Sequence, residues 1–192
     1  MPFAIVLIVL ATAWRIVAAY FPMLVNFSPL MALAFCGAVY FSNKRLWLVP
    51  FAALTLSDLY LDHYYATNFN YEWTFGGALI RALCFAAGLG LGAMVARNRS
   101  WLNILSGALT GSVFFYLVTN TASFLGDATY VHTLAGWWQA MTVGHPEFPP
   151  TILFFRNTLV SDLVFTGVFA AAMEYAALHA GRPSLLTKRV SA

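Results

Sequence analysis

Arg81 and Cys84 stand three residues apart in a long apolar stretch, a pairing that could support metal chemistry. Residues at i and i+3 lie on the same face of a helix. A neighbouring cation favours the thiolate form of a cysteine, whereas burial opposes it, and a thiolate is a soft ligand suited to transition metals. The pair therefore predicts a metal-ligating cysteine at position 84. The alternative is that Cys84 packs as a small apolar side chain, the common role of a lone buried cysteine.

Cys36, the second of the two cysteines, has no charged neighbour at helical spacing. Its surroundings favour packing, and it is the second choice as a metal ligand. The four histidines show none of the spacings typical of zinc sites. The sequence also contains no phosphate-binding loop and no nucleophile elbow of the hydrolase type. We therefore expect neither an ATP site nor serine-hydrolase chemistry.

Arg81 is one of five charged positions in apolar stretches, namely Arg15, Asp58, Arg81, Arg156 and Asp162. A charged side chain near the centre of a membrane helix costs roughly 2.5–3.5 kcal/mol on insertion scales. Such residues normally face the bundle interior or a wet cavity and pair with one another. Three arginines and two aspartates do not pair one-to-one, so one arginine is left for polar groups or a ligand. The alternative is a set of ion pairs that only hold the helices together.

The composition defines the elements that must position these residues. Of 192 residues, 61% are hydrophobic and 9% are charged, against roughly 25% charged in an ordinary soluble domain. We expect an all-α integral membrane protein, in one domain over residues 1–192. A span needs about 20 apolar residues. Arg15 inside the first apolar stretch, and the lack of a basic segment before it, favour a membrane helix over a signal peptide. Six spans are expected, over residues 3–21, 28–42, 46–61, 75–96, 101–124 and 151–178.

The connections between these stretches differ in charge. Those at 22–27, 62–74 and 125–150 contain no Lys or Arg. The positive-inside rule then places both termini in the cytoplasm and these three connections outside. At 1.5 Å per residue, Arg81 would lie about 7 Å and Cys84 about 12 Å below the outer surface. The basic residues of the remaining connections and the C-terminus are Lys44, Arg45, Arg97, Arg99, Arg182, Lys188 and Arg189.

The outer connections at 62–74 and 125–150 are rich in aromatic residues. One interpretation is an aromatic belt at the membrane surface. The other is a lid over an outward-facing site, because long structured loops are usually functional. Part of 133–142 is expected to form a short interfacial helix.

The chain resembles the substrate-binding S-component of energy-coupling-factor (ECF) vitamin transporters. The resemblance lies in the six expected helices, the cytoplasmic termini, the long outer loops and the lack of an ATP site. The intramembrane cysteine resembles that of the BtuM-type cobalamin transporters within this class. The strings "NFSPLMALAFCGAVYFSNKR", "FFYLVTNTASFL" and "FFRNTLVSDLVFTGVF" also resemble a wider set of bacterial membrane proteins. The resemblance covers most of the chain and implies a multi-pass protein of the bacterial inner membrane that takes up cobalamin (vitamin B12).

The resemblance implies that the Cys84 thiolate ligates the cobalt of cobalamin and helps to displace an axial ligand such as cyanide. Arg81 would tune the thiol, and Cys36 is the second candidate ligand. A corrinoid also needs a wide cavity with aromatic walls and hydrogen-bonding side chains. Candidates for these walls, besides Arg81, are Asn68, Asn70, Tyr71, Trp73, Asn120, Trp137 and Trp138.

An ECF-type energising module is the partner that the resemblance implies. The AxxxA patterns, however, lie at residues 34–38 and 82–86, whereas S-components carry them on the first helix. Three other functions stay open. The first is transport of another small vitamin, with Cys84 as a packing residue. The second is an intramembrane enzyme that uses the Arg and Asp residues. The third is a purely structural role. No nucleic acid is expected as a partner.

Overall fold

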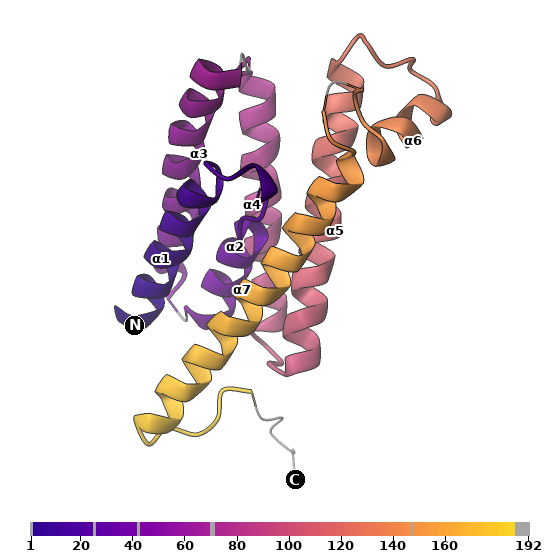
Figure 1. Cartoon of the computed structure of the whole chain (residues 1–192). Coiled ribbons are helices and arrows are strands. Elements are labelled where there is room, and N and C mark those ends of the chain that lie inside the picture. The colour runs from indigo at the N-terminus through magenta and orange to yellow at the C-terminus, as the bar shows by residue number, and fades with distance from the viewer. Residues whose placement is uncertain (1, 25, 42, 70–71, 147, 187–192) are drawn as a thin grey trace.

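The structure, a computed structural model, describes residues 2–24, 26–41, 43–69, 72–146 and 148–186. Every regular element within these ranges is helical, which confirms the all-α prediction for them. Figure 1 shows a bundle in which the long α7 crosses the other helices at an angle. The elements, in chain order, are α1 Pro2–Ala18, η1 Pro22–Leu24, α2 Leu30–Tyr40, η2 Lys44–Trp47, α3 Leu48–Phe69, α4 Phe75–Val95, α5 Trp101–Gly126, α6 Leu134–Thr142 and α7 Thr151–His179.

Hydroxyl side chains cap three of these helices and fix where each one begins. Thr74 accepts a hydrogen bond from the Gly77 N–H at the start of α4, at 3.1 Å. Ser100 does the same at the start of α5, and Thr133 at the start of α6. Such caps satisfy backbone donors that have no partner inside the helix. Each cap precedes an apolar run, so these boundaries follow from the local sequence.

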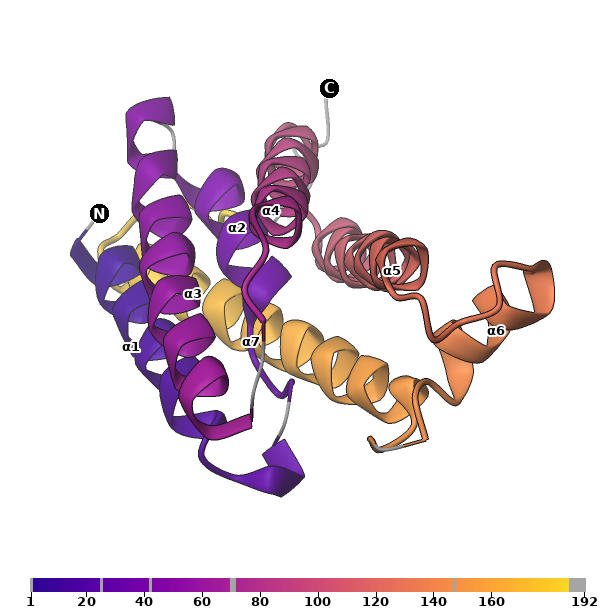
Figure 2. The same ribbon diagram turned by 90° about the horizontal axis from the view of Figure 1, so that it is seen from above.

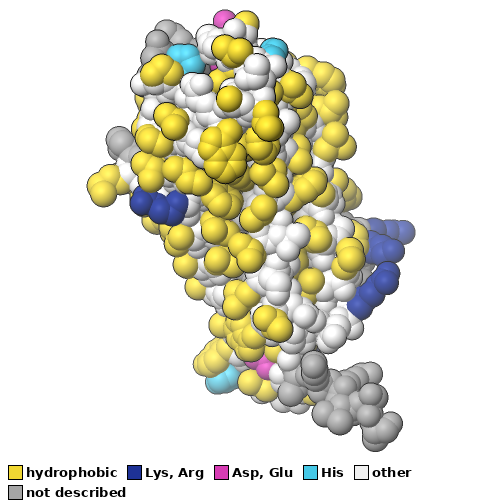
Figure 3. Space-filling view, turned by 90° about the vertical axis from the view of Figure 1, so that its right-hand side faces the viewer, with side chains coloured by type: hydrophobic (Ala, Val, Ile, Leu, Met, Phe, Trp, Pro, Cys, Tyr) yellow, Lys and Arg dark blue, Asp and Glu magenta, His cyan; other side chains and the backbone are white. Residues whose placement is uncertain are grey.

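Three helices, α4, α5 and α7, are long and apolar enough to cross a membrane. They indicate a membrane protein. The helix α1 is apolar but has 17 residues, and the 22-residue α3 carries several polar residues along its length. Figure 3 shows a largely hydrophobic face, with Lys and Arg restricted to a few patches.

The helix α2 is shorter than the expected span over 28–42 and lies inside the bundle. It has 11 residues, so it extends about 16 Å, roughly half of the ~30 Å hydrocarbon core. Every residue from Met31 to Tyr40 is buried. The expected span over 28–42 is therefore not confirmed as a membrane-crossing helix, because the helix starts only after Pro29 and ends at Tyr40. Its first turn lies at mid-height in the bundle (Figure 1).

Glycines on the neighbouring helices let α2 pack at short distance. A β-carbon added to Gly88 of α4 would lie 2.8 Å from Cε of Met31, and one added to Gly92 would collide with the carbonyl oxygen of Phe35. A β-carbon at Gly107 of α5 would lie 2.6 Å from the Phe35 ring. These small residues let the helix backbones approach closely.

Candidate binding pocket

Four charged side chains from three helices form one continuous row. Arg15 of α1 pairs with the Oδ1 atom of Asp58 on α3. Arg81 of α4 donates from Nε to the Asp58 Oδ2 atom at 3.0 Å and from Nη2 to the Asp62 Oδ2 atom at 2.5 Å. The charges alternate in the order Arg15, Asp58, Arg81, Asp62, and we call this set the Arg–Asp row. The four side chains expose only 7–19% of their surface.

Arg15 also anchors the row to the backbone of α3. Its Nη1 atom donates to the Ser57 hydroxyl and, at 3.5 Å, to the Leu54 carbonyl oxygen. Its Nε atom is buried and has no hydrogen-bond partner within the described part of the chain. Buried charges are tolerated only where partners replace the lost water. The row therefore depends on its own members, and on Ser57 and Leu54 beside it, to replace that water.

The Arg–Asp row lines a pocket of about 240 Å³. The pocket lies at the N-terminal end of α2. Leu30, the first residue of this helix, and Ser28, just before it, form part of the pocket wall. The Ser28 hydroxyl is buried and has no hydrogen-bond partner among the described residues. The full lining is Arg15, Ala18, Ala19, Leu24, Asn26, Ser28, Leu30, Asp58, Leu61, Asp62, Tyr65, Arg81, Phe115 and Thr158.

A second pocket of about 150 Å³ adjoins the first one between α5 and α7. The two pockets share Asn26, Phe115 and Thr158, so they adjoin at these residues. Asn120, one of the residues expected to bind the ligand, lines this second pocket. Its side-chain amide donates to the Tyr116 carbonyl oxygen at 2.9 Å.

Cys84 lies on the same helix as Arg81 but does not line either pocket. The residue is 1% exposed. The Arg81 guanidinium points to the two aspartates of α3. An ion pair of Arg81 was the alternative that the sequence left open to a partnership with the Cys84 thiol. The described residues also contain no group of three His, Cys, Asp or Glu side chains that could hold a metal ion.

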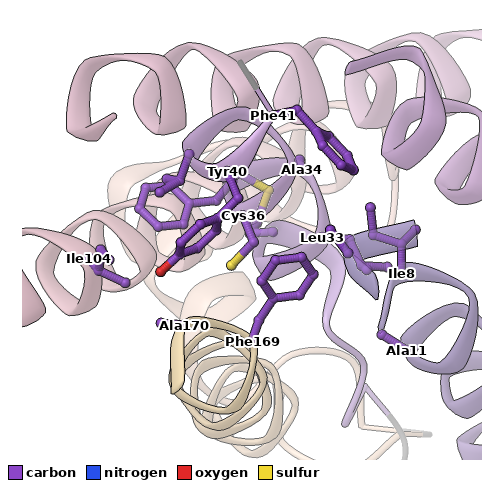
Figure 4. Close-up of a cluster of buried hydrophobic side chains, with 14 of the residues drawn as sticks. Ile8, Ala11, Leu33, Ala34, Cys36, Tyr40, Phe41, Ile104, Phe169 and Ala170 are labelled. Atoms are coloured by element: carbon purple, nitrogen blue, oxygen red, sulfur yellow. The ribbon is translucent and has the colours of Figure 1, made fainter. Parts of the chain in front are cut away.

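Cys36 lies in the hydrophobic core on α2. Figure 4 shows it next to Tyr40 of the same helix and Phe169 of α7, whose rings lie 5.5 Å apart. Cys36 is 1% exposed and is a free thiol, like Cys84. These surroundings agree with the packing role that its sequence favours.

Most other residues predicted for the ligand site lie elsewhere. Asn68 is exposed and donates to the Tyr64 carbonyl oxygen at 2.8 Å. Trp73 is exposed beside the start of α4. Asn70 and Tyr71 lie outside the described residues. Of the predicted set, Arg81 thus lines the first pocket and Asn120 the second.

The segment 125–150 does not cover the pockets. It contains the short helix α6, which confirms the helix expected within 133–142. Trp137 donates to the Thr121 hydroxyl at 3.0 Å, and the Tyr116 hydroxyl donates to the Met141 carbonyl oxygen, so α6 is fastened to α5. Figures 1 and 2 both show α6 beside α5, away from the centre of the bundle. No described residue of 125–150 lines either pocket.

Exposed apolar side chains on α6 favour the membrane-surface interpretation over a lid. Trp138 is 63% exposed, and Leu134 is also exposed. Before this helix, the Thr129 hydroxyl and N–H donate to Asp127 at 2.6 and 2.8 Å. These two hydrogen bonds lower the pKa of Asp127 from its usual value and fix the turn that leads to α6.

Asp162 and Arg156 do not belong to the Arg–Asp row. Asp162 is 0% exposed and accepts hydrogen bonds from the Ala32 N–H at 2.9 Å and the Ser112 hydroxyl at 2.7 Å. Arg156 is exposed and donates to the Asn157 side chain at 3.3 Å. Asp58 lines the pocket whereas Asp162 does not, so the two aspartates do not share the cavity that an enzyme using both would need.

Sequence reasoning missed Asp62 as a member of the site. It placed Asp62 in an outer loop, but α3 continues to Phe69. Asp58 and Asp62 are four residues apart, a spacing that places two carboxylates on one helix face. That spacing was the available signal. Ser28, Asn26 and Thr158 carried no comparable signal, because they meet only through the fold.

The helices and the pocket define an all-α membrane protein with a charged, net-neutral cavity among its helices. The chain belongs to DUF6580, a family of unknown function, whose match covers residues 1–185. No curated protein and no solved structure matches it.

Proposed function

We propose that the protein is a membrane uptake protein that binds a small polar solute in the pocket lined by the Arg–Asp row. The observation that carries this proposal is that four charged side chains from three helices line one cavity. Ionisable residues in membrane segments are costly and typically mark a substrate pathway. Ion pairs with a purely structural role need no cavity beside them.

The proposed topology has six membrane-embedded helices, α1 to α5 and α7, with both termini in the cytoplasm of a bacterial inner membrane. The basic residues of η2 and of the α4–α5 turn lie at the end of the bundle where α7 finishes (Figure 1). The pocket lies toward the other end. The helix α2 is too short to cross the membrane by itself and begins at the pocket. This arrangement supports transport, because transporters use discontinuous helices at substrate sites.

The volume of the pocket favours a small solute over a corrinoid. Typical ligand pockets measure roughly 300–1,000 Å³, and the main pocket here holds about 240 Å³. A corrinoid is larger than drug-sized ligands, so its binding would require the helices to separate. We therefore rank transport of a smaller solute ahead of transport of cobalamin.

Mass spectrometry of the small molecules released from the purified protein tests this proposal. We expect a small polar solute to co-purify with the wild-type protein and with Arg156→Gln, which removes an exposed charge outside the pocket. The solute should be lost from Asp58→Asn and reduced in Ser28→Ala. The Ser28 hydroxyl makes no hydrogen bond within the described chain, so this second variant should fold. Equal amounts of solute in all four proteins, or none in any, would overturn the proposal.

Cobalamin is the second candidate, because Cys84 lies on the Arg81 face of α4 one turn deeper. The test is the visible absorption spectrum of protein purified after growth with cobalamin. Thiolate ligation predicts an altered cobalamin spectrum in the wild-type protein and in Cys36→Ser. Cys84→Ser should lack the alteration. An identical cobalamin spectrum in Cys84→Ser would rule out the thiol ligand.

A further inference from the structure

The charges of the main pocket constrain the solute that it accepts. Its charged lining residues are two arginines and two aspartates, so they sum to zero. The remaining ten lining residues carry no charge. A solute with a net charge would enter a cavity that offers no net counter-charge, and burying an unpaired ion is costly. The pocket therefore selects against net anions and net cations.

The order of the charges adds a second constraint. Along the row, positive and negative groups alternate, with Asp58 and Asp62 one helical turn apart on α3. This spacing is about 6 Å along the helix axis. A wall of alternating charge attracts a solute that carries a positive and a negative group. Each group of the solute then lies against a lining residue of opposite charge. An uncharged apolar solute would instead displace water from these groups without replacing its hydrogen bonds.

Resting on the proposed function, we infer that the solute is a small zwitterion with one anionic and one cationic group, of amino-acid size. The anionic group lies near Arg15, the positive end of the row, in the pocket that Ser28 also lines. The cationic group lies at Asp62, the negative end of the row. A carboxylate has about four acceptor positions, and Arg81 occupies the Oδ2 side of Asp62.

Thermal unfolding of the purified full-length protein in detergent tests this inference with defined probes. The probes are glycine betaine and the common amino acids other than Asp, Glu, Lys and Arg as the zwitterion set, succinate and acetate as anions, and putrescine as a cation, all at matched ionic strength. We expect at least one zwitterion to raise the unfolding temperature, because a ligand of the folded state stabilises it. Acetate, succinate and putrescine should leave it unchanged.

Asp62→Asn provides the sharper result, because it gives the pocket one net positive charge. We expect the affinity for the zwitterion to fall by more than about tenfold. The same variant should gain affinity for acetate, which a merely structural role of Asp62 would not produce. Asp127→Asn removes a carboxylate outside the pocket and should behave like the wild-type protein.

The outcomes separate this inference from the proposed function. If succinate, acetate or putrescine binds the wild-type protein and no zwitterion does, the zwitterion inference is wrong and solute binding stands. If a zwitterion binds but Asp62→Asn neither weakens it nor gains acetate, the assignment of Asp62 is wrong. If no probe binds any folded variant and no solute co-purifies, both proposals fail.

Discussion

Asp58 is the residue on which the Arg–Asp row depends, since it accepts hydrogen bonds from both arginines. Each carboxylate oxygen receives one guanidinium. Two helices, α1 and α4, are therefore joined to α3 through one side chain. Removing it would leave Arg15 without its carboxylate and Arg81 with Asp62 alone, and a buried charge without its partner is strongly destabilising.

Asp58→Ala is expected to lower the free energy of unfolding by about 3 kcal/mol. The measurement is equilibrium denaturation of the purified protein in detergent. Asp127→Ala is the matched control, because this aspartate lies in a turn outside the row. A change in Asp58→Ala no larger than in the control would show that the arginines find other partners and that the row is not continuous.

Part of the site was predictable from residues alone. Arg15, Asp58 and Arg81 attract attention because charges in apolar helices must be paired or wet. The pairing was not predictable, since it depends on how α1, α3 and α4 are placed around one another. Cys84 illustrates the limit: its spacing from Arg81 is correct for a partnership, but the guanidinium is drawn to the two aspartates of another helix.

At the scale of elements, α2 is the unusual feature. It is short and buried, and its N-cap residue Pro29 makes no side-chain cap hydrogen bond. Asp162 of α7 supplies the acceptor instead, through the Ala32 N–H. A carboxylate at a helix N-terminus is also favoured by the helix dipole. The floor of the pocket is therefore held in place by a residue that is distant in sequence.

Asp162→Ala is expected to destabilise the protein by about 1–3 kcal/mol, because it leaves the Ala32 N–H and the Ser112 hydroxyl without their acceptor. Asp162→Asn keeps one acceptor oxygen and should retain most of the stability. Denaturation midpoints of the two variants provide the measurement. A larger loss in Asp162→Asn than in Asp162→Ala would contradict the capping role.

Gly92 and Gly90 form a matched pair on α4. Gly92→Ala would drive a β-carbon into the Phe35 carbonyl oxygen, whereas Gly90→Ala meets no atom within 4 Å. We expect Gly92→Ala to cost about 1–3 kcal/mol through overpacking. Gly90→Ala should stabilise the helix by up to about 1 kcal/mol. Equal unfolding temperatures for the two variants would show that α2 shifts freely away from α4.

The sequence indicated the type of these elements better than their lengths. The apolar stretch over 28–42 has the composition of a span, but Pro29 removes its first turn and the helix ends at Tyr40. For α3 the error runs the other way, because polar residues after position 61 resemble a loop and yet continue the helix to Phe69. Hydropathy marks where a chain contacts lipid, whereas a helix between other helices also accepts polar residues.

In the whole molecule, the two adjoining pockets lie on the side of α2 away from two basic turns, η2 and the α4–α5 connection. The positive-inside rule assigns those turns to the cytoplasm. On the proposed topology, the main pocket then opens toward the outer side. The orientation is accordingly a separate claim that can be tested by itself.

Cysteine labelling with a membrane-impermeant maleimide tests this orientation in intact cells. Native Cys36 and Cys84 are each 1% exposed and should remain unlabelled until the protein is denatured. In a background without these two thiols, Ala128→Cys should be labelled from outside and Asn98→Cys only after the cells are opened. The reverse pattern would place the pocket on the cytoplasmic side.

Isothermal titration of the purified protein with the zwitterion selected by thermal unfolding tests directly whether the Arg–Asp row forms a solute site. We expect saturable one-to-one binding to the wild-type protein and to Asp127→Asn. Binding should be more than about tenfold weaker in Asp62→Asn. Ser28→Ala should also weaken it. The absence of binding to the wild-type protein, or equal affinity in all four proteins, would contradict a solute site on the Arg–Asp row.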